Sequence, residues 1–531
     1  MYLEIIAMMG RKPYGQLFAL AAGIVLVPGC ALQIKVDEDW NLRKNRPIPL
    51  GEVSGTWQQI RNGELPTDEQ LATYNKSVRS SVVQIAKNWS NDKATLSEID
   101  TTEGTVQIDV NPGAIREVDM IDEVIPADFV RVKKGFDEST HVDGVGAPLM
   151  VRKRWSESDP MIPSTGLWYP VTGILNFDQP HRPILELYDP TRQPHLVSNG
   201  RSVPLSVDYT ATFARDFQDR QRQFVDVGGL LQFDKFADRM GMYRISAFDP
   251  EKRVCVLVHG INSTPMTWHV FLNQAYDDPE IRQRYEFWTF GYPTGAPIPY
   301  LAEKLRNSIE NMRSFRAKKG ATNEGFVLVG HSMGGLLSKA ATQRGGQSDW
   351  DKLFKVSIEE LEVSEKDREI LRNLVYYEPV SGIERVVLCA VPHRGSKLAA
   401  KPGARLIGDL IQVPQQLAQL TKDIVKQSGY ALTPLGLELA DKPNSISQLN
   451  PKSRVHSEYL NKPLNPNVEF YSVLGRKNPS DPLHESTDGV VPYTSAHIEG
   501  VVSETVIDGS PHGVHRTDGG IREILRILKM P

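Results

Sequence analysis

The stretch that decides the fold of this chain is FVLVGHSMGG, residues 326–335. Four apolar residues precede a Gly-x-Ser-x-Gly pattern, and a run rich in leucine and alanine follows it. A buried strand, a sharp turn and a helix account for that order, because only glycines fit where strand and helix backbones come so close. We expect Ser332 to stand above the end of the strand, at a helix N-terminus that favours developing negative charge.

Apolar runs of similar length recur on both sides of this stretch, with segments of helical spacing such as 299–315 between them. The runs span residues 254–258, 287–290 and 386–391, and further strands are expected at 468–474 and 504–507. Unbroken apolar strands that alternate with helices are typical of a parallel sheet buried on both faces. The fold class predicted from this pattern is α/β.

A serine hydroxyl becomes nucleophilic only when a base removes its proton, and a third group must orient that base. Along a chain of this kind the acid is expected first and the histidine second, after the last strands. We predict Ser332 as nucleophile, Asp488 as orienting acid and His512 as general base. Spacing alone leaves three alternatives open: Asp481 and Glu485 for the acid, and His515 for the base.

Developing negative charge on the attacked carbonyl oxygen requires two backbone N–H donors. One is expected from Met333, directly after the serine. The other is expected from Ile261, because His259-Gly260-Ile261 follows a buried strand and the glycine permits close approach. His259 itself is interpreted as a residue that braces this loop.

From about residue 248 to its end, the chain resembles bacterial α/β-hydrolases of the lipase/esterase type, especially large lipoprotein-like members. The matching pieces are VHG at 258–260, FWTFGYPTG at 287–295, the serine turn, PHRGS at 392–396, and DGVVPY at 488–493 with SAH at 495–497. The resemblance implies an α/β-hydrolase fold, and it favours Asp488 as the acid and His512 as the base. It also implies that the insertion at about 397–465 is either a mobile lid or a fixed helical cap.

The first thirty residues are typical of a segment that directs export, and we do not expect them to be part of a folded domain. Arg11 and Lys12 precede an apolar run over 17–27, which is too short to span a bilayer permanently, and VPGC at 27–30 resembles a bacterial lipobox. We therefore expect residues 1–29 to be a lipoprotein signal peptide and Cys30 to carry the lipid. The expected location is the bacterial envelope, with the chain anchored on the periplasmic or surface side of the outer membrane.

The region between this leader and the α/β pattern carries no recognisable chemical constellation. A capping box at Thr67 and Gln70 begins a helical stripe, and short strand-like pieces follow at 129–132, 149–152, 184–188 and 203–209. We predict a tether over 30–65, an N-terminal α+β or β-rich domain of unknown role over 66–245, and a catalytic α/β-hydrolase domain over 246–531.

Composition narrows the possible functions. The 531 residues carry a net charge of −4 and 24% charged side chains, so nothing electrostatic favours nucleic-acid binding. No cofactor or metal is expected, since the histidines and the three cysteines lack metal-ligand spacing. Cys255 and Cys389 are expected to be core residues on strands that are not neighbours. The leading hypothesis is a serine hydrolase acting on lipid or acyl esters. The alternatives are a non-catalytic envelope binding protein, and a thioesterase or acyltransferase with the same three residues.

Overall fold

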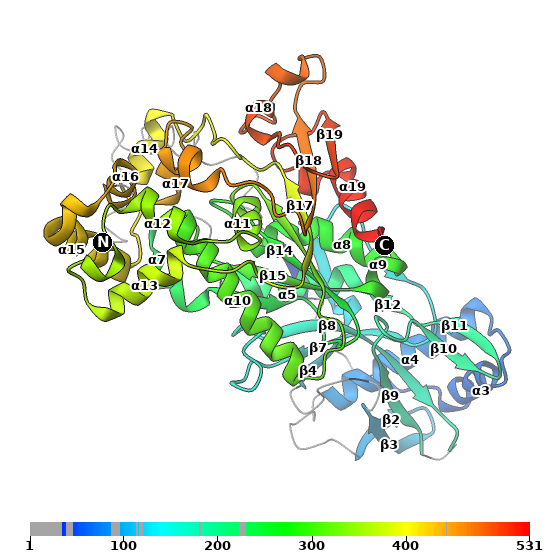
Figure 1. Ribbon diagram of the computed structural model, residues 1–531. Coiled ribbons are helices and arrows are strands. Elements are labelled where there is room, and N and C mark those ends of the chain that lie inside the picture. Colours follow the sequence, from blue (N-terminus) through cyan, green and yellow to red (C-terminus); the bar gives the residue numbers. More distant parts are fainter. Residues whose placement is uncertain are drawn as a thin grey trace, which may run out of the picture.

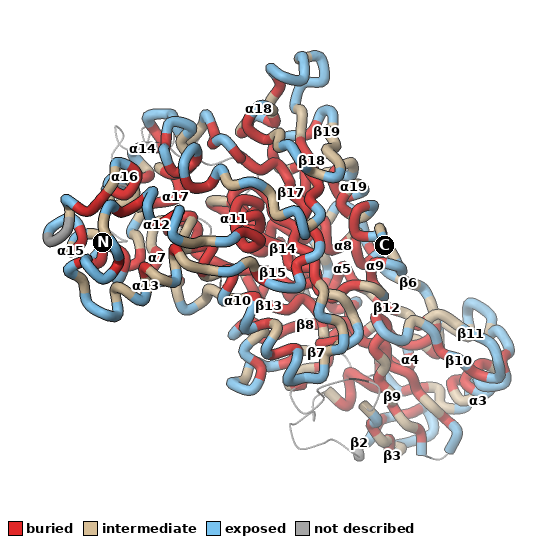
Figure 2. The backbone as a smooth tube through the Cα atoms, in the orientation of Figure 1, coloured by how far each residue is buried: buried red, intermediate tan, exposed pale blue. Residues whose placement is uncertain are grey.

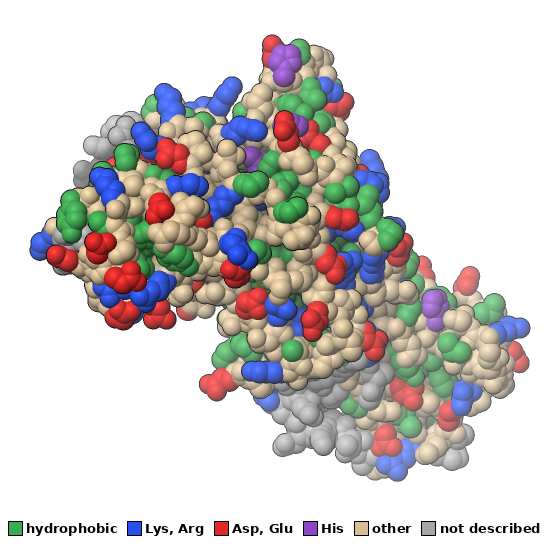
Figure 3. Space-filling model, viewed as in Figure 1, with side chains coloured by type: hydrophobic (Ala, Val, Ile, Leu, Met, Phe, Trp, Pro, Cys, Tyr) green, Lys and Arg blue, Asp and Glu red, His purple; other side chains and the backbone are tan. Residues whose placement is uncertain are grey.

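The computed structural model describes residues 34–531 except 39–45, 87–95, 113–114, 116–120, 180–181, 222, 224–229 and 442. The predicted signal peptide and Cys30 therefore lie outside the described residues. Among the described residues, no helix is both long and apolar enough to cross a membrane. On the face drawn in Figure 3, Lys and Arg side chains are interspersed with Asp and Glu side chains.

A seven-stranded sheet forms the centre of the molecule (Figure 1), in the order β13-β15-β14-β16-β17-β18-β19. All neighbouring strands are parallel except β13, which runs antiparallel to β15 at one edge. The predicted parallel sheet is confirmed. The strands are β13 (Gly241–Arg244), β14 (Arg253–Val258), β15 (Tyr285–Gly291), β16 (Phe326–His331), β17 (Ile383–Cys389), β18 (Glu469–Arg476) and β19 (Ser503–Asp508).

Helices cover both faces of this sheet, which explains why its strands are apolar without alternation. Along β14, Val256 and Val258 belong to the core beneath one set of helices, while Cys255 and Leu257 belong to the opposite core. Figure 2 shows the buried residues concentrated along this sheet. The first set includes α10 (Ile298–Lys318) and α11 (Met333–Ala341), and the second includes α8 (His269–Asp277), α9 (Pro279–Arg284) and α19 (Asp518–Lys529).

The two core cysteines lie where the sequence predicted. Cys255 is on β14 and Cys389 is on β17, and β16 lies between these strands. Both thiols are free and fully buried, and burial raises their pKa values.

The N-terminal region builds a second sheet, of six strands, in the order β2-β3-β9-β8-β7-β4. Its strands are β2 (Leu96–Thr101), β3 (Gly104–Asn111), β4 (Ile121–Pro126), β7 (Ala147–Lys153), β8 (Leu167–Asn176) and β9 (Ile184–Tyr188). Helix α4 (Asp68–Ala86) packs against it through Tyr74 and Val78. The predicted capping box begins this helix, because Gln70 N–H donates to Thr67 Oγ1 and Thr67 N–H donates to Gln70 Oε1.

The remaining short elements lie around this second sheet and in the loops. They are β5 (Val130–Lys134), β6 (His141–Val142), β10 (His195–Ser198), β11 (Arg201–Pro204), β12 (Val207–Asp208), α7 (Phe233–Phe236) and α18 (Tyr493–Ala496). The piece predicted at 203–209 is therefore divided between β11 and β12.

The structure corrects the predicted tether over 30–65. Within that range, β1 (Lys35–Glu38) pairs with β5, and α3 (Leu50–Arg61) is a helix with Val53, Trp57 and Ile60 buried. Trp57 Nε1 also donates to Asp178 Oδ1 at 3.1 Å. The prolines and glycines in this range led to the prediction of a tether. The apolar residues of α3 nevertheless form a helical stripe that packs against the rest of the fold.

The predicted boundary at residue 245/246 also differs from the structure. Strand β13 precedes it but joins the central sheet, and α5 (Tyr209–Gln221) packs against α8 with the Phe213 and Tyr276 ring centroids 4.7 Å apart. Lys153 of β7 and Arg244 of β13 both pair with the buried Asp159. The two regions therefore share buried surface and buried charge.

The insertion predicted at about 397–465 is helical. It contains α14 (Pro402–Gly408), α15 (Gln415–Ser428), α16 (Pro434–Asp441), α17 (Ser445–Gln448) and a π-helical turn at Val455–Leu460. A second helical segment, α12 (Gln347–Leu353) with α13 (Glu365–Val375), lies between β16 and β17. Figure 1 shows both segments on the same side of the molecule.

Candidate active site

Ser332 occupies a strained turn between β16 and α11. Its φ of 54° and ψ of −124° are unusual for a non-glycine residue, and holding such a conformation costs about 1–3 kcal/mol. The surrounding glycines are sterically required. A Cβ on Gly334 would lie 2.3 Å from the carbonyl oxygen of Val258, and one on Gly330 would lie 2.7 Å from that of Gly334. The turn therefore fixes the position of the Ser332 hydroxyl.

His512 links Ser332 to Asp488. Its Nε2 lies 3.0 Å from Ser332 Oγ, and its Nδ1 lies 2.7 Å from Asp488 Oδ2. The carboxylate accepts from Nδ1–H, which leaves the lone pair of Nε2 directed at the serine hydroxyl. The three side chains come from three separate loops after β16, β18 and β19, and each is buried.

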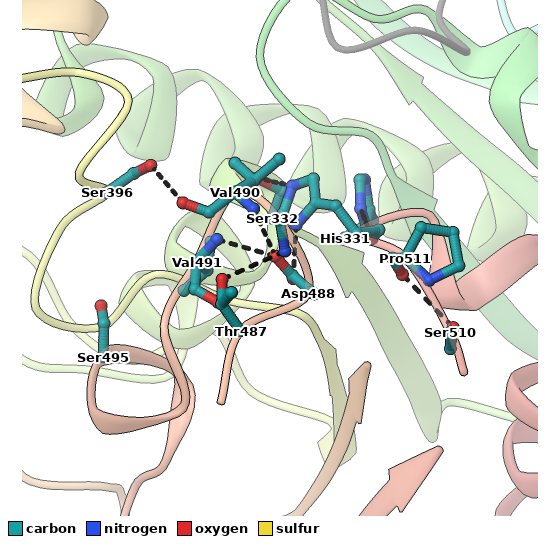
Figure 4. A network of polar contacts seen from close by, with 12 residues as sticks. His331, Ser332, Ser396, Thr487, Asp488, Val490, Val491, Ser495, Ser510 and Pro511 are labelled. Atoms are coloured by element: carbon teal, nitrogen blue, oxygen red, sulfur yellow. Dashed lines mark hydrogen bonds and ion pairs between the residues drawn. The ribbon is translucent and has the colours of Figure 1, made fainter. Parts of the chain in front are cut away.

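Asp488 is oriented by the loop that carries it, as Figure 4 shows. The amides of Val490 and Val491 donate to its Oδ1 at 2.8 and 2.7 Å, so that Oδ2 is left for the histidine. The turn requires Gly489, whose φ is +96°. The sequence signal for this arrangement was the turn-forming glycine before an apolar pair.

The alternative acids lie elsewhere in the same loop. Asp481 accepts from Asn478 Nδ2 at 2.6 Å, and Glu485 is exposed beside His484. Neither contributes to the arrangement around His512.

His515 lies close to the site but is not paired with Asp488. Its Nε2 is 3.0 Å from Thr267 Oγ1, and its ring packs against Trp268 at 4.7 Å and His331 at 4.0 Å between centroids. Burial and nearby charges, including His331 and Arg516, hold its pKa well below the usual value. The geometry of a general base is therefore present at His512 and not at His515.

His331 has a contact that the sequence analysis missed. Its Nε2–H donates to the backbone carbonyl of His512 at 3.0 Å, and its ring lies between those of His512 and His515. Burial keeps the pKa of His331 well below its ordinary value, so the imidazole is neutral. No signal in the sequence marks this contact, because it joins positions 181 residues apart.

The predicted N–H donors come from the residue after Ser332 and from a residue that lines the same cavity. Met333 is the first residue of α11, where an N–H has no acceptor within its own helix. Ile261 borders the cavity that Ser332 and His512 also line. The next amide along, that of Asn262, already donates to Thr294 Oγ1 at 3.1 Å.

His259 has the bracing role that the sequence predicted. Its ring stacks on Tyr292 with centroids 4.2 Å apart, and its carbonyl accepts from the Tyr292 hydroxyl at 2.6 Å. Burial lowers its pKa to about 3.

In the part of the chain that the structure describes, no group of three His, Cys, Asp or Glu side chains is placed to hold a metal ion.

The architecture is defined by three features: the strained turn at Ser332, the strand order of the central sheet, and the helices on both of its faces. The fold is α/β-hydrolase-like. No protein-family model and no curated protein matches the chain. The N-terminal sheet is an addition to this fold.

Several solved structures resemble this chain over about half of its length. The Bacillus licheniformis lipase BlEst2 is 16% identical in its mature form, with 54% of this chain and 97% of that chain covered and a TM-score of 0.31. In the propeptide form of the same lipase the identity is 15%, and this chain covers 51% of that chain at a TM-score of 0.32. Lipase 1 from Pelosinus fermentans is 12% identical, with 53% and 100% of the two chains covered and a TM-score of 0.31.

Proposed function

We propose that the protein is a serine hydrolase that cleaves carboxylic esters, with lipid or acyl esters as its substrate class. The observation that carries the proposal is the continuous contact from Ser332 Oγ through His512 to Asp488. The support for the proposal is geometric, since serine hydrolases with unrelated folds use the same three groups together.

The reaction begins when Ser332 Oγ attacks the ester carbonyl carbon and His512 Nε2 takes the hydroxyl proton. Asp488 stabilises the resulting imidazolium while remaining ionised. The N–H groups of Met333 and Ile261 stabilise the tetrahedral oxyanion. His512 then protonates the leaving alcohol as the ester C–O bond breaks.

The second half of the reaction releases the acid. Water attacks the acyl group on Ser332, with His512 Nε2 again accepting the proton, and the serine hydroxyl is restored when His512 returns it. Each proton removed is returned, so the cycle needs no cofactor.

Covalent labelling by a fluorophosphonate probe tests this proposal on the full chain. Wild type is expected to label, and Ser332→Ala is expected not to label. The matched control is Ser338→Ala on the same helix, because Ser338 is buried and its hydroxyl donates to the Gly334 carbonyl. Labelling that persists in Ser332→Ala would assign the nucleophile elsewhere, and a wild type that never labels would favour the non-catalytic binding protein.

We also propose that the chain is exported and held at the outer membrane by lipid on Cys30, on the periplasmic or surface side. The support is the basic pair at 11–12, the apolar run at 17–27 and the lipobox-like VPGC at 27–30. A lipid anchor would bring the enzyme close to ester substrates in or near the membrane.

A further inference from the structure

The cavity beside Ser332 is small and is lined by both polar and apolar side chains. Its volume is about 80 Å³. The polar lining includes Ser332, His512 and the side chains of Asn262 and Thr267. The apolar lining includes Ala404, Ile446, Leu449 and Val491.

The volume limits what the cavity accepts. One water molecule needs roughly 10–15 Å³ of such space, so the whole cavity has room for about five to eight water molecules. That is enough for a carbonyl with two or three further carbons, and it is far below the roughly 300–1,000 Å³ of sites for drug-sized ligands. An octanoyl group exceeds it.

Two apolar lining residues, Ile446 and Leu449, belong to a segment that is firmly attached. Ser445 N–H donates to the Gly295 carbonyl at 3.1 Å, and Ser445 Oγ donates to the Thr294 carbonyl at 2.6 Å. At the other end of α17, Gln448 Oε1 accepts from Ile298 N–H at 2.7 Å. Ser445 and Gln448 are fully buried, so breaking these bonds without replacements would be costly.

Leu449 is fixed in the same way from the opposite side. Its carbonyl accepts from Ser396 N–H at 2.9 Å, and its side chain belongs to the main core. Ile446 packs with Leu230 and Ala404 in a smaller core that includes partly buried Ile261. The segment 445–449 is therefore a fixed wall of the site.

The apolar space elsewhere in the insertion does not extend this cavity. A second cavity, of about 120 Å³, lies among α13, α15 and α16, and among the described residues none lines both. The most exposed apolar side chains of the insertion, Leu406, Leu410 and Tyr430, border neither cavity. The cavity at Ser332 and the cavity among α13, α15 and α16 are therefore separate spaces.

We propose that this enzyme takes esters of short acyl groups, acetyl to butanoyl, and that Ile446 and Leu449 set the upper limit. The inference rests on the proposed ester hydrolysis and narrows its substrate class. The acyl group lies against the apolar walls of the cavity, because it stays bonded to Ser332 while the alcohol must leave.

The test is the hydrolysis of p-nitrophenyl acetate, butanoate and octanoate by the full chain, below and above the critical micelle concentration of an added detergent. We expect kcat/KM for octanoate to be at least about tenfold below that for butanoate in both conditions, since each methylene in a fitted pocket changes discrimination severalfold or more. Octanoate hydrolysed as well as butanoate, in either condition, would overturn the proposal.

Two substitutions, one that enlarges the cavity and one that reduces it, test which side chains limit the acyl-chain length. Ile446→Ala should raise the octanoate-to-acetate ratio of kcat/KM by about tenfold, and Ala404→Val should lower the butanoate-to-acetate ratio by a similar factor. Leu437→Ala is the control, because Leu437 is 46% exposed on α16 and outside the cavity, and it should leave both ratios unchanged.

Ile446→Val removes a single methylene and serves if the alanine variant does not fold. Ratios that stay at wild-type values in both Ile446→Val and Ala404→Val would show that these walls do not set the limit. Absence of any ester turnover together with absence of fluorophosphonate labelling would instead contradict the proposed hydrolase function.

Discussion

At the scale of single residues, His512 is decisive because its two ring nitrogens have two different partners. Replacing it by alanine removes the proposed base and leaves Asp488 without its donor. We expect His512→Ala to lower kcat for a short ester by at least about a thousandfold. His515→Ala should keep kcat within about tenfold, because His515 is a packing residue in this geometry.

Steady-state kinetics on p-nitrophenyl acetate measures both variants, with circular dichroism to check that each is folded. The reverse result, a severe loss in His515→Ala and a mild one in His512→Ala, would assign the base to His515.

The role of a single residue can be predicted from the sequence when its contacts are local in the sequence, and not when they join distant positions. Ser332 follows from a local pattern of glycines, and Asp488 from a turn of four residues. His331 stands at a variable position of the Gly-x-Ser-x-Gly pattern, which by itself indicates no role. Its contacts with His512 and His515 depend on how the loops after β16 and β19 meet, which spacing along the chain does not encode.

At the scale of elements, the turn between β16 and α11 depends on Gly334 having no side chain. A Cβ there would lie 2.3 Å from the Val258 carbonyl, on the backbone of β14, and neither strand nor helix can retreat from a packed core. We expect Gly334→Ala to abolish ester turnover and to lower the free energy of unfolding by about 1–3 kcal/mol.

Gly55→Ala is the matched control, because nothing lies within 4 Å of the added Cβ and the residue is exposed in the interior of α3. The variant should keep wild-type turnover. Its free energy of unfolding should rise by about 0.5–1 kcal/mol, since alanine is more favourable than glycine inside a helix. Urea denaturation followed by circular dichroism measures both changes. Destabilisation by Gly55→Ala would argue against the helix at 50–61, and unchanged activity in Gly334→Ala would argue against the tight turn.

The success of the element predictions follows from periodicity. All six parallel strands were predicted, and the inner ones are marked most clearly, because strands buried on both faces are nearly continuous in apolar residues. Strand β13 and helix α3 were missed for opposite reasons. Strand β13 is only four residues long, and the apolar stripe of α3 is interrupted by glycines.

At the scale of the whole molecule, attachment to the membrane is predicted to depend on Cys30 alone. The net charge is −4, and no described helix can span a bilayer. Nothing electrostatic therefore favours an anionic membrane surface. We expect Cys30→Ser to move the protein from the membrane fraction to the soluble fraction after cell lysis, without loss of specific activity on acetate esters.

Cys389→Ser is the control, because its thiol is buried in the central sheet and takes no part in anchoring. It should remain in the membrane fraction. Continued membrane association of Cys30→Ser would contradict the lipoprotein proposal without affecting the hydrolase proposal.

The stability of the whole molecule should fall steeply in mild acid, because six histidines are buried in neutral form. Burial lowers the pKa to about 3 for His259, and to about 4 for His269 and His456. The other three have pKa values well below normal: His331, His393 and His515. In the unfolded chain all six titrate near pH 6.5.

The sign follows from which state binds the protons. Below about pH 6.5 the unfolded chain gains protons that the folded protein does not, so stability present above that pH is lost as the pH falls toward 4. Three carboxyls oppose this, since burial raises the pKa of Glu286 to about 7, that of Asp216 to about 6 and that of Asp208 above its ordinary value. They take up protons while the protein is folded.

Because the six histidines outnumber these carboxyls, unfolding takes up protons on balance below about pH 6.5, and each net proton lowers the free energy of unfolding by about 1.4 kcal/mol per pH unit. Urea denaturation at several pH values measures this slope.

His456→Leu removes one of the six, and neither of its ring nitrogens has a hydrogen-bond partner among the described residues. It should reduce the slope by about 1.4 kcal/mol per pH unit. His484→Leu, at a side chain that is 75% exposed, should leave the slope unchanged. A slope that is flat between pH 6.5 and 4, or equal in His456→Leu and wild type, would show that the buried histidines titrate normally in the folded protein.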